Sequence, residues 1–121
     1  MLREKSCGSV RLTWIDRTEL LTNLRSTAAR IRQERPEVRE VRLFGSLARN
    51  DQSGESDADL LIVLEPTAQS DPLDAIRRYY GFFNLPVSVD LLVYDQEQLE
   101  SEVESGNVFL KTILFESIVL A

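Results

Sequence analysis

The most restrictive feature of the sequence is an apolar run over residues 58–64, which reads Ala-Asp-Leu-Leu-Ile-Val-Leu. It follows a polar stretch over 50–56, predicted to be a loop, and stops before Pro66. A short continuous run between turn signals is typical of a strand that is buried on both faces. Because such a strand needs helices on both sides of its sheet, the run favours a layered α/β fold.

The rest of the sequence predicts the remaining strands and the helices that cover the sheet. Partial alternation predicts a strand over 38–44, and a β-branched, apolar segment predicts another over 87–94. Helices are expected from Asp16 or Thr18 to about 35, where Pro36 ends the first, and over 72–80, 96–104 and 108–115, before a short terminal strand over 117–120. We therefore expect one α/β (α+β) domain over residues 16–121, with a mixed sheet of three or more strands flanked by helices. Residues 1–15 are interpreted as an N-terminal extension, either partly disordered or an added strand.

Two residue counts limit the possible chemistry. Histidine is absent, and Cys7 is the only cysteine. These counts exclude a Ser-His-Asp triad, a histidine general base, a histidine zinc site and a thiolate metal cluster. Carboxylates are plentiful, with 20 Asp and Glu in 121 residues. The metals that fit are therefore hard cations bound through oxygen.

The net charge of −6 is unevenly distributed. Residues 1–50 hold 11 basic and 6 acidic residues, a net +5, whereas residues 51–121 hold 3 and 14, a net −11. An acidic domain is a poor candidate for direct nucleic-acid binding. The basic half can hold a nucleoside triphosphate or simply form a solvated helix face. No run is long enough to span a membrane, and the first residues lack the apolar core of a secretion signal, so we expect a cytoplasmic protein.

Three carboxylates occur at or inside predicted strands. Asp57 and Asp59 are two residues apart, so they project from the same face, and Asp90 lies in the next strand. Buried unpaired carboxylates cost several kcal/mol each, and neighbouring carboxylates repel. A divalent cation that bridges them removes both penalties, and oxygen-only ligation favours Mg²⁺ or Mn²⁺.

A second motif precedes these carboxylates at a predicted strand-to-helix junction. Gly45 allows the backbone to approach a phosphate closely, and the following N–H groups favour an anion. The Ser46 hydroxyl adds a donor, and Arg49 lies one turn further on. Ten residues separate Ser46 from Asp57. A phosphate cradle that faces a metal cluster indicates phosphoryl or nucleotidyl transfer.

Residues 44–63 resemble the signature of the DNA polymerase beta-like nucleotidyltransferase superfamily, Gly-Ser-x-Ala-Arg-Gly followed by Ser-Asp-x-Asp-Leu. Residues 89–92, Val-Asp-Leu-Leu, are similar to the strand that carries its third carboxylate. Over about residues 16–121 the chain looks like the minimal nucleotidyltransferase (MNT) group. It departs from the family pattern at Asn50, where glycine is usual, and at Ala121, where an aromatic residue is frequent. Asn tolerates left-handed backbone well, so we expect the first departure to do little harm.

The resemblance implies a palm-like nucleotidyltransferase fold and transfer of a nucleoside monophosphate, usually AMP from ATP, onto a hydroxyl. It implies that Asp57 and Asp59 hold two Mg²⁺ ions, with Mn²⁺ as an alternative. Asp90 would share the second ion and favour deprotonation of the acceptor. The Gly45 backbone and Ser46 would hold the outgoing phosphates, and Arg49 would offset their charge.

MNT proteins commonly pair with a HEPN-domain RNase toxin and neutralise it, in some systems by adding AMP to a tyrosine. The resemblance therefore implies an antitoxin that forms a hetero-oligomer with a HEPN toxin. Two alternatives stay open: a small-molecule nucleotidyltransferase with a separate acceptor-binding subunit, and a module that inhibits its partner by contact alone. Three matched carboxylates favour catalysis over contact alone.

Residues 108–115, Val-Phe-Leu-Lys-Thr-Ile-Leu-Phe, are more apolar than one packing face requires. One interpretation is that the terminal strand buries this helix. The other is that Phe109 or Phe115 stays exposed and docks the partner, with the four glutamates of residues 97–104 as an acidic rim.

Overall fold

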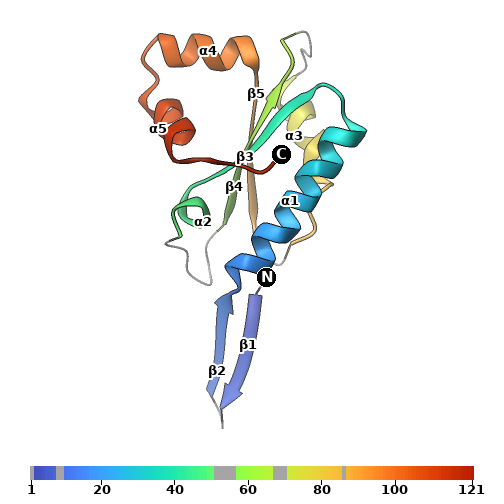
Figure 1. The fold of residues 1–121 in the computed structure, drawn as a ribbon, viewed down its shortest axis with the longest axis vertical. Helices are drawn as coiled ribbons and strands as arrows, with labels where there is room; N and C mark the ends of the chain where they lie inside the picture. Colours follow the sequence, from blue (N-terminus) through green and yellow to red (C-terminus); the bar gives the residue numbers. More distant parts are fainter. Residues whose placement is uncertain (1, 8–9, 51–56, 67–70, 86) are drawn as a thin grey trace.

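The computed structural model describes residues 2–7, 10–50, 57–66, 71–85 and 87–121. The loop predicted over 50–56 therefore lies outside the described residues, apart from Asn50. The elements follow one another as β1 (Leu2–Cys7), β2 (Val10–Ile15), α1 (Arg17–Glu34), β3 (Val38–Phe44), α2 (Ser46–Arg49), β4 (Ala58–Leu64), α3 (Pro72–Tyr80), β5 (Val89–Asp95), α4 (Gln96–Glu104), α5 (Val108–Glu116) and β6 (Ile118–Val119), as labelled in Figure 1.

A four-stranded mixed sheet organises the domain. Its strand order is β5-β4-β3-β6. β3 runs antiparallel to both of its neighbours, whereas β4 and β5 are parallel. The parallel pair requires a crossover, which α3 provides, and α3 packs beside β5. The expected α/β domain with a mixed sheet is confirmed.

Each face of the sheet has its own apolar core. The even-numbered residues of β4 pack with α1 and α3, while Leu61 and Val63 pack with α4 and α5. Figure 1 shows α1 and α3 on one side of the sheet and α4 and α5 on the other. All seven residues of β4 except Asp59 are buried, as a central strand requires. None of the described helices is long and apolar enough to cross a membrane.

The sequence pattern predicts most element boundaries because every described helix except α2 begins at an Asp or Asn whose side chain caps it. Asp16 accepts a hydrogen bond from the Glu19 amide at the start of α1, and Asp71 accepts one from the Leu73 amide at the start of α3. The strands over 38–44 and 58–64 and the helices over 72–80 and 96–104 are confirmed residue for residue. The third strand begins at 89 instead of 87, and it includes Asp95, which also caps α4.

The N-terminal extension contains two strands. β1 and β2 pair antiparallel from Leu2 opposite Ile15 to Cys7 opposite Val10. They form a sheet of their own, which extends away from the rest of the domain in Figure 1. Of the two interpretations of this segment, added strands agree with the structure, although they add to each other and not to the main sheet.

Candidate functional site

The end of β3 meets the starts of β4 and β5 in one row across the sheet. The strand registers pair Phe44 with Asp59, and Asp59 with Asp90. Paired residues of neighbouring strands project from the same face, so the two carboxylates lie side by side. Because side chains alternate along β4, they share the face of Leu61, and therefore that of α4 and α5. The topology thus brings Gly45, the residue after Phe44, to the carboxylates.

Gly45 is in contact with the Asp59 side chain. Its φ of 76° and ψ of −156° belong to a region that is essentially restricted to glycine. A Cβ at this position would collide with the Asp59 carboxylate. The Gly45 backbone therefore lies close to a carboxylate of the protein itself, and its approach to a phosphate stays a prediction.

The short helix after Gly45 is held from several sides. The Leu47 side chain is fully buried, and the Arg17 guanidinium of α1 donates a hydrogen bond to the Leu47 carbonyl, at 3.0 Å. Ser46 is half-buried in the first turn. Asn50 ends α2 with left-handed backbone (φ 62°, ψ 36°), which confirms that asparagine fills the usual glycine position without distortion.

The Asp59 carboxyl has a raised pKa. Burial raises its pKa to about 6, and the negative charges of Asp90 and Asp57 and a hydrogen bond with Asp90 act in the same direction, while Arg49 acts in the opposite one. These influences show that the four side chains are close enough to interact. A carboxyl with such a pKa is stabilised in its ionised form when a cation arrives.

Asp57 and Asp90 are exposed, and Asp59 is half-buried, so the predicted carboxylates lie at the open end of the strands and not inside the core. Among the residues that the structure describes, no three acidic or other ligating side chains are gathered tightly enough to hold a metal ion by themselves. Mg²⁺ is usually bound by one or two carboxylates together with substrate phosphates and water. The Asp59–Asp90 pair fits that mode of binding.

Glu116 is a member of the site that the sequence pattern did not predict. Its carboxylate accepts a hydrogen bond from the Gly45 amide at 3.1 Å. Its oxygens also accept hydrogen bonds from Arg49 Nη1, at 3.2 Å to Oε1 and at 3.1 Å to Oε2. No local pattern marks this residue, because it is separated from Gly45 by 71 positions in the sequence.

The fold presents a glycine turn beside the paired strand carboxylates Asp59 and Asp90. The chain belongs to the nucleotidyltransferase domain family, whose sequence profile matches residues 24–120. No curated relative matches the sequence.

Two solved structures share the fold. A structure from Sulfolobus solfataricus, described as a nucleotidyltransferase, aligns with a TM-score of 0.61 and 21% identity over 85% of this chain and 80% of that chain. A toxin–antitoxin structure with AMP-PNP aligns with a TM-score of 0.52 and 18% identity over 88% of this chain and 73% of that chain. At these identities the likeness establishes the palm-like architecture.

Proposed function

We propose that this protein transfers AMP from ATP to a hydroxyl, in a reaction that depends on Mg²⁺, and that the acceptor is a tyrosine of a HEPN RNase toxin. The observation that carries the proposal is the row at the open end of the sheet, in which Asp59 touches the Gly45 backbone and pairs with Asp90. This row places groups suited to a cation next to a backbone turn suited to phosphates.

The residues of the site would divide into a cation-binding group and a phosphate-binding group. Asp57, Asp59 and Asp90 would hold the Mg²⁺ ions, which supply charge stabilisation to the triphosphate when bound. The Gly45 amide, the Ser46 hydroxyl and Arg49 would orient the outgoing phosphates. Asp90, at the exposed edge strand β5, is accessible to an acceptor hydroxyl and would favour loss of its proton.

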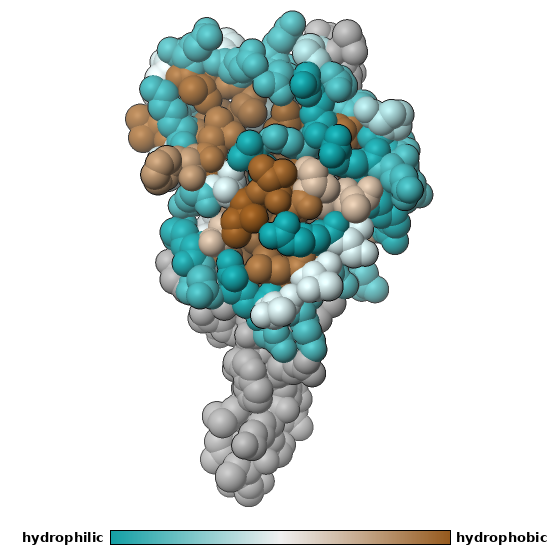
Figure 2. All heavy atoms as spheres, in the orientation of Figure 1, coloured by the Kyte–Doolittle hydropathy of each residue, from teal (hydrophilic) through white to brown (hydrophobic). Residues whose placement is uncertain are grey.

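The acceptor must come from elsewhere. The resemblance to MNT proteins and the fold shared with a toxin–antitoxin structure both support a toxin partner. The chain also offers a surface for one: Val108, Phe109 and Phe115 of α5 are 72%, 61% and 93% exposed. Figure 2 shows apolar atoms gathered over α5 and over the terminal segment in front of the sheet.

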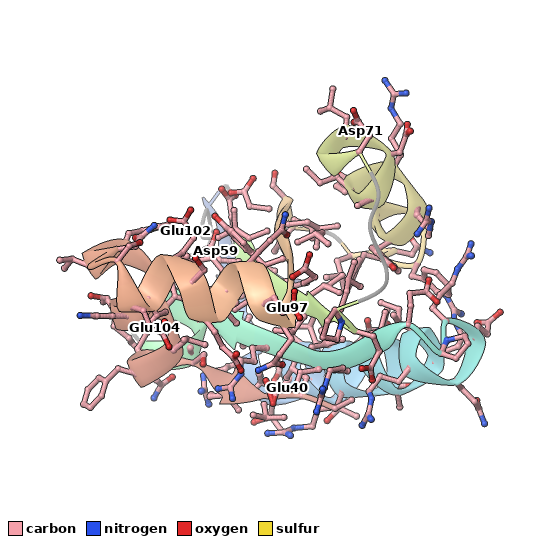
Figure 3. All side chains as sticks on the ribbon, turned by 90° about the horizontal axis from the view of Figure 1, so that it is seen from above. Glu40, Asp59, Asp71, Glu97, Glu102 and Glu104 are labelled. Carbon is pink, nitrogen blue, oxygen red and sulfur yellow. The ribbon has the colours of Figure 1, made fainter. Side chains whose placement is uncertain are left out.

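Charge indicates what kind of partner fits this surface. Figure 3 shows Glu97 and Glu104 projecting from one side of α4 and Glu102 from the other. All three are exposed, as is Glu100. Carboxylates on α4, the helix that packs beside α5, would repel nucleic acid and a second copy of the same face, and they would complement a protein with a basic rim. An enzyme that binds RNA carries such a basic surface.

A mass measurement tests the proposal. The protein encoded beside this chain's gene is purified, incubated with this protein, ATP and Mg²⁺, and examined for the added mass of AMP and for the residue that carries it. We expect one AMP on a tyrosine, and none with Asp59→Asn. Neutralisation of the toxin without added mass would instead favour inhibition by contact alone, and AMP on a small molecule would favour the separate acceptor subunit.

A further inference from the structure

Glu116 occupies the groups that the proposed function assigns to the nucleotide phosphates. The Gly45 amide and the Arg49 guanidinium both bind its carboxylate, in contacts of 3.1 to 3.2 Å. The Glu116 side chain is largely buried, at 18% exposure, whereas that of Arg49 is 47% exposed. The phosphate cradle therefore already contains an anion that belongs to the protein.

The sheet register explains why this carboxylate is there. β6 pairs antiparallel with β3, with Ile118 opposite Leu43 and Val119 opposite Arg42. This pairing brings the end of α5, which directly precedes β6, to the end of β3, where Gly45 follows. Glu116 is also the last residue of α5, whose buried residues Leu110 and Ile113 anchor the helix on the sheet. The backbone of Glu116 is thus fixed at the site, while its side chain has rotatable bonds of its own.

We propose that Glu116 is a built-in competitor for the phosphates of the nucleotide, which must displace its carboxylate from Gly45 and Arg49 in order to bind. The Gly45 amide has a single N–H for which a phosphate oxygen and the carboxylate would compete, and two anions beside Arg49 repel each other. A triphosphate replaces the lost contacts with its own oxygens, whereas a ligand without phosphates gains nothing at the cradle. Glu116 thereby disfavours weakly charged ligands. This inference rests on the proposed function.

Binding of ATP in the presence of Mg²⁺, measured by calorimetry on the full chain without a partner, tests the inference. Glu116→Gln keeps an oxygen for the Gly45 amide but removes the charge that pairs with Arg49. We expect the dissociation constant for ATP to fall about 1.5- to fivefold, the range for loss of a partly exposed ion pair. Affinity for adenosine, which has no phosphate, should not change.

Two comparisons separate competition from a general change in charge or folding. Glu34→Gln makes the same change in net charge at the end of α1, whose opposite end carries the Arg17 contact to α2, and it should leave ATP binding unchanged. Glu116→Asp keeps the charge but withdraws it by one methylene, and it should also tighten ATP binding. If Glu116→Gln lowers the melting temperature, ATP binding by the Glu116→Asp variant is compared with that of the parent instead.

A double-mutant cycle adds a stringent criterion. Arg49→Ala should weaken ATP binding more in the Glu116→Gln background than in the parent, because the Glu116 charge then no longer competes with the phosphates for Arg49. ATP binding that is unchanged or weaker in a folded Glu116 variant would overturn the inference and show that Glu116 positions the cradle. Absence of ATP binding in the parent and in every variant would contradict the proposed function itself.

Discussion

A single glycine determines how closely the backbone can approach the Asp59 carboxylate. Gly45→Ala places a side chain on backbone with a positive φ, which costs about 1–3 kcal/mol. The added Cβ would also collide with the Asp59 carboxylate. We expect loss of ATP binding together with a lower melting temperature. Gly106→Ala is the matched control, because Gly106 also has a positive φ, of 94°, but a Cβ added there would meet no atom within 4 Å. Equal destabilisation by the two substitutions, with ATP binding retained, would contradict a close approach at Gly45.

The pKa of Asp59 makes a second prediction at the residue scale. Because its folded pKa, about 6, lies above its ordinary value of 3.8, Asp59 favours folding below pH 3.8 and this contribution is lost as the pH rises through 6. In the presence of a metal chelator, the free energy of unfolding of the Asp59→Asn variant should therefore equal that of the parent near pH 4 and exceed it near pH 7.5. Urea unfolding at both values measures this. A variant less stable than the parent at pH 7.5 would show that ionised Asp59 stabilises the fold.

Two interpretations of the sequence competed at helix α5: burial by the terminal strand, and an exposed phenylalanine that docks the partner. The structure shows which side chains are exposed, and docking stays a prediction. Leu110 and Ile113 are buried, while Phe109 and Phe115 are exposed. Phe115→Ser should therefore leave the melting temperature unchanged and weaken binding of the partner. Leu73→Ser, which removes an exposed apolar side chain from α3, controls for general loss of apolar surface. A large drop in melting temperature with Phe115→Ser, or equal loss of binding with Leu73→Ser, would contradict docking at α5.

Elements were predictable where the signal is local. The apolar run of β4 and the caps at Asp16 and Asp95 are sequence features, and the corresponding boundaries agree with the structure. The strand order and the pairing of Asp59 with Asp90 depend on contacts between distant segments, which periodicity does not encode. Glu116 was missed for the same reason, since the pairing of β6 with β3 and the packing of α5 on the sheet bring it to Gly45.

At the scale of the whole molecule, the N-terminal hairpin and the nucleotidyltransferase domain each form a sheet of their own. β1 and β2 pair with each other and with no described strand of the main sheet. Removal of residues 1–15, which keeps the Asp16 cap of α1, should therefore leave the thermal unfolding transition of the domain and its ATP affinity unchanged. Circular dichroism and calorimetry measure the two. A broad or strongly lowered transition would show that the hairpin stabilises the domain.

The row that carries Asp59 and Asp90 also marks a boundary. One step further along the same face, Leu61 belongs to the core under α4 and α5, whereas Asp59 faces solvent and charge. Two positions on one strand thus separate Asp59, a residue of the candidate site, from Leu61, a residue of the core. We expect that a descendant of this protein that lost either carboxylate would lose mutual repulsion, together with a ligand of the proposed metal site, and would keep its fold. The architecture therefore allows evolution to convert a catalyst into a pure binding protein by one or two substitutions.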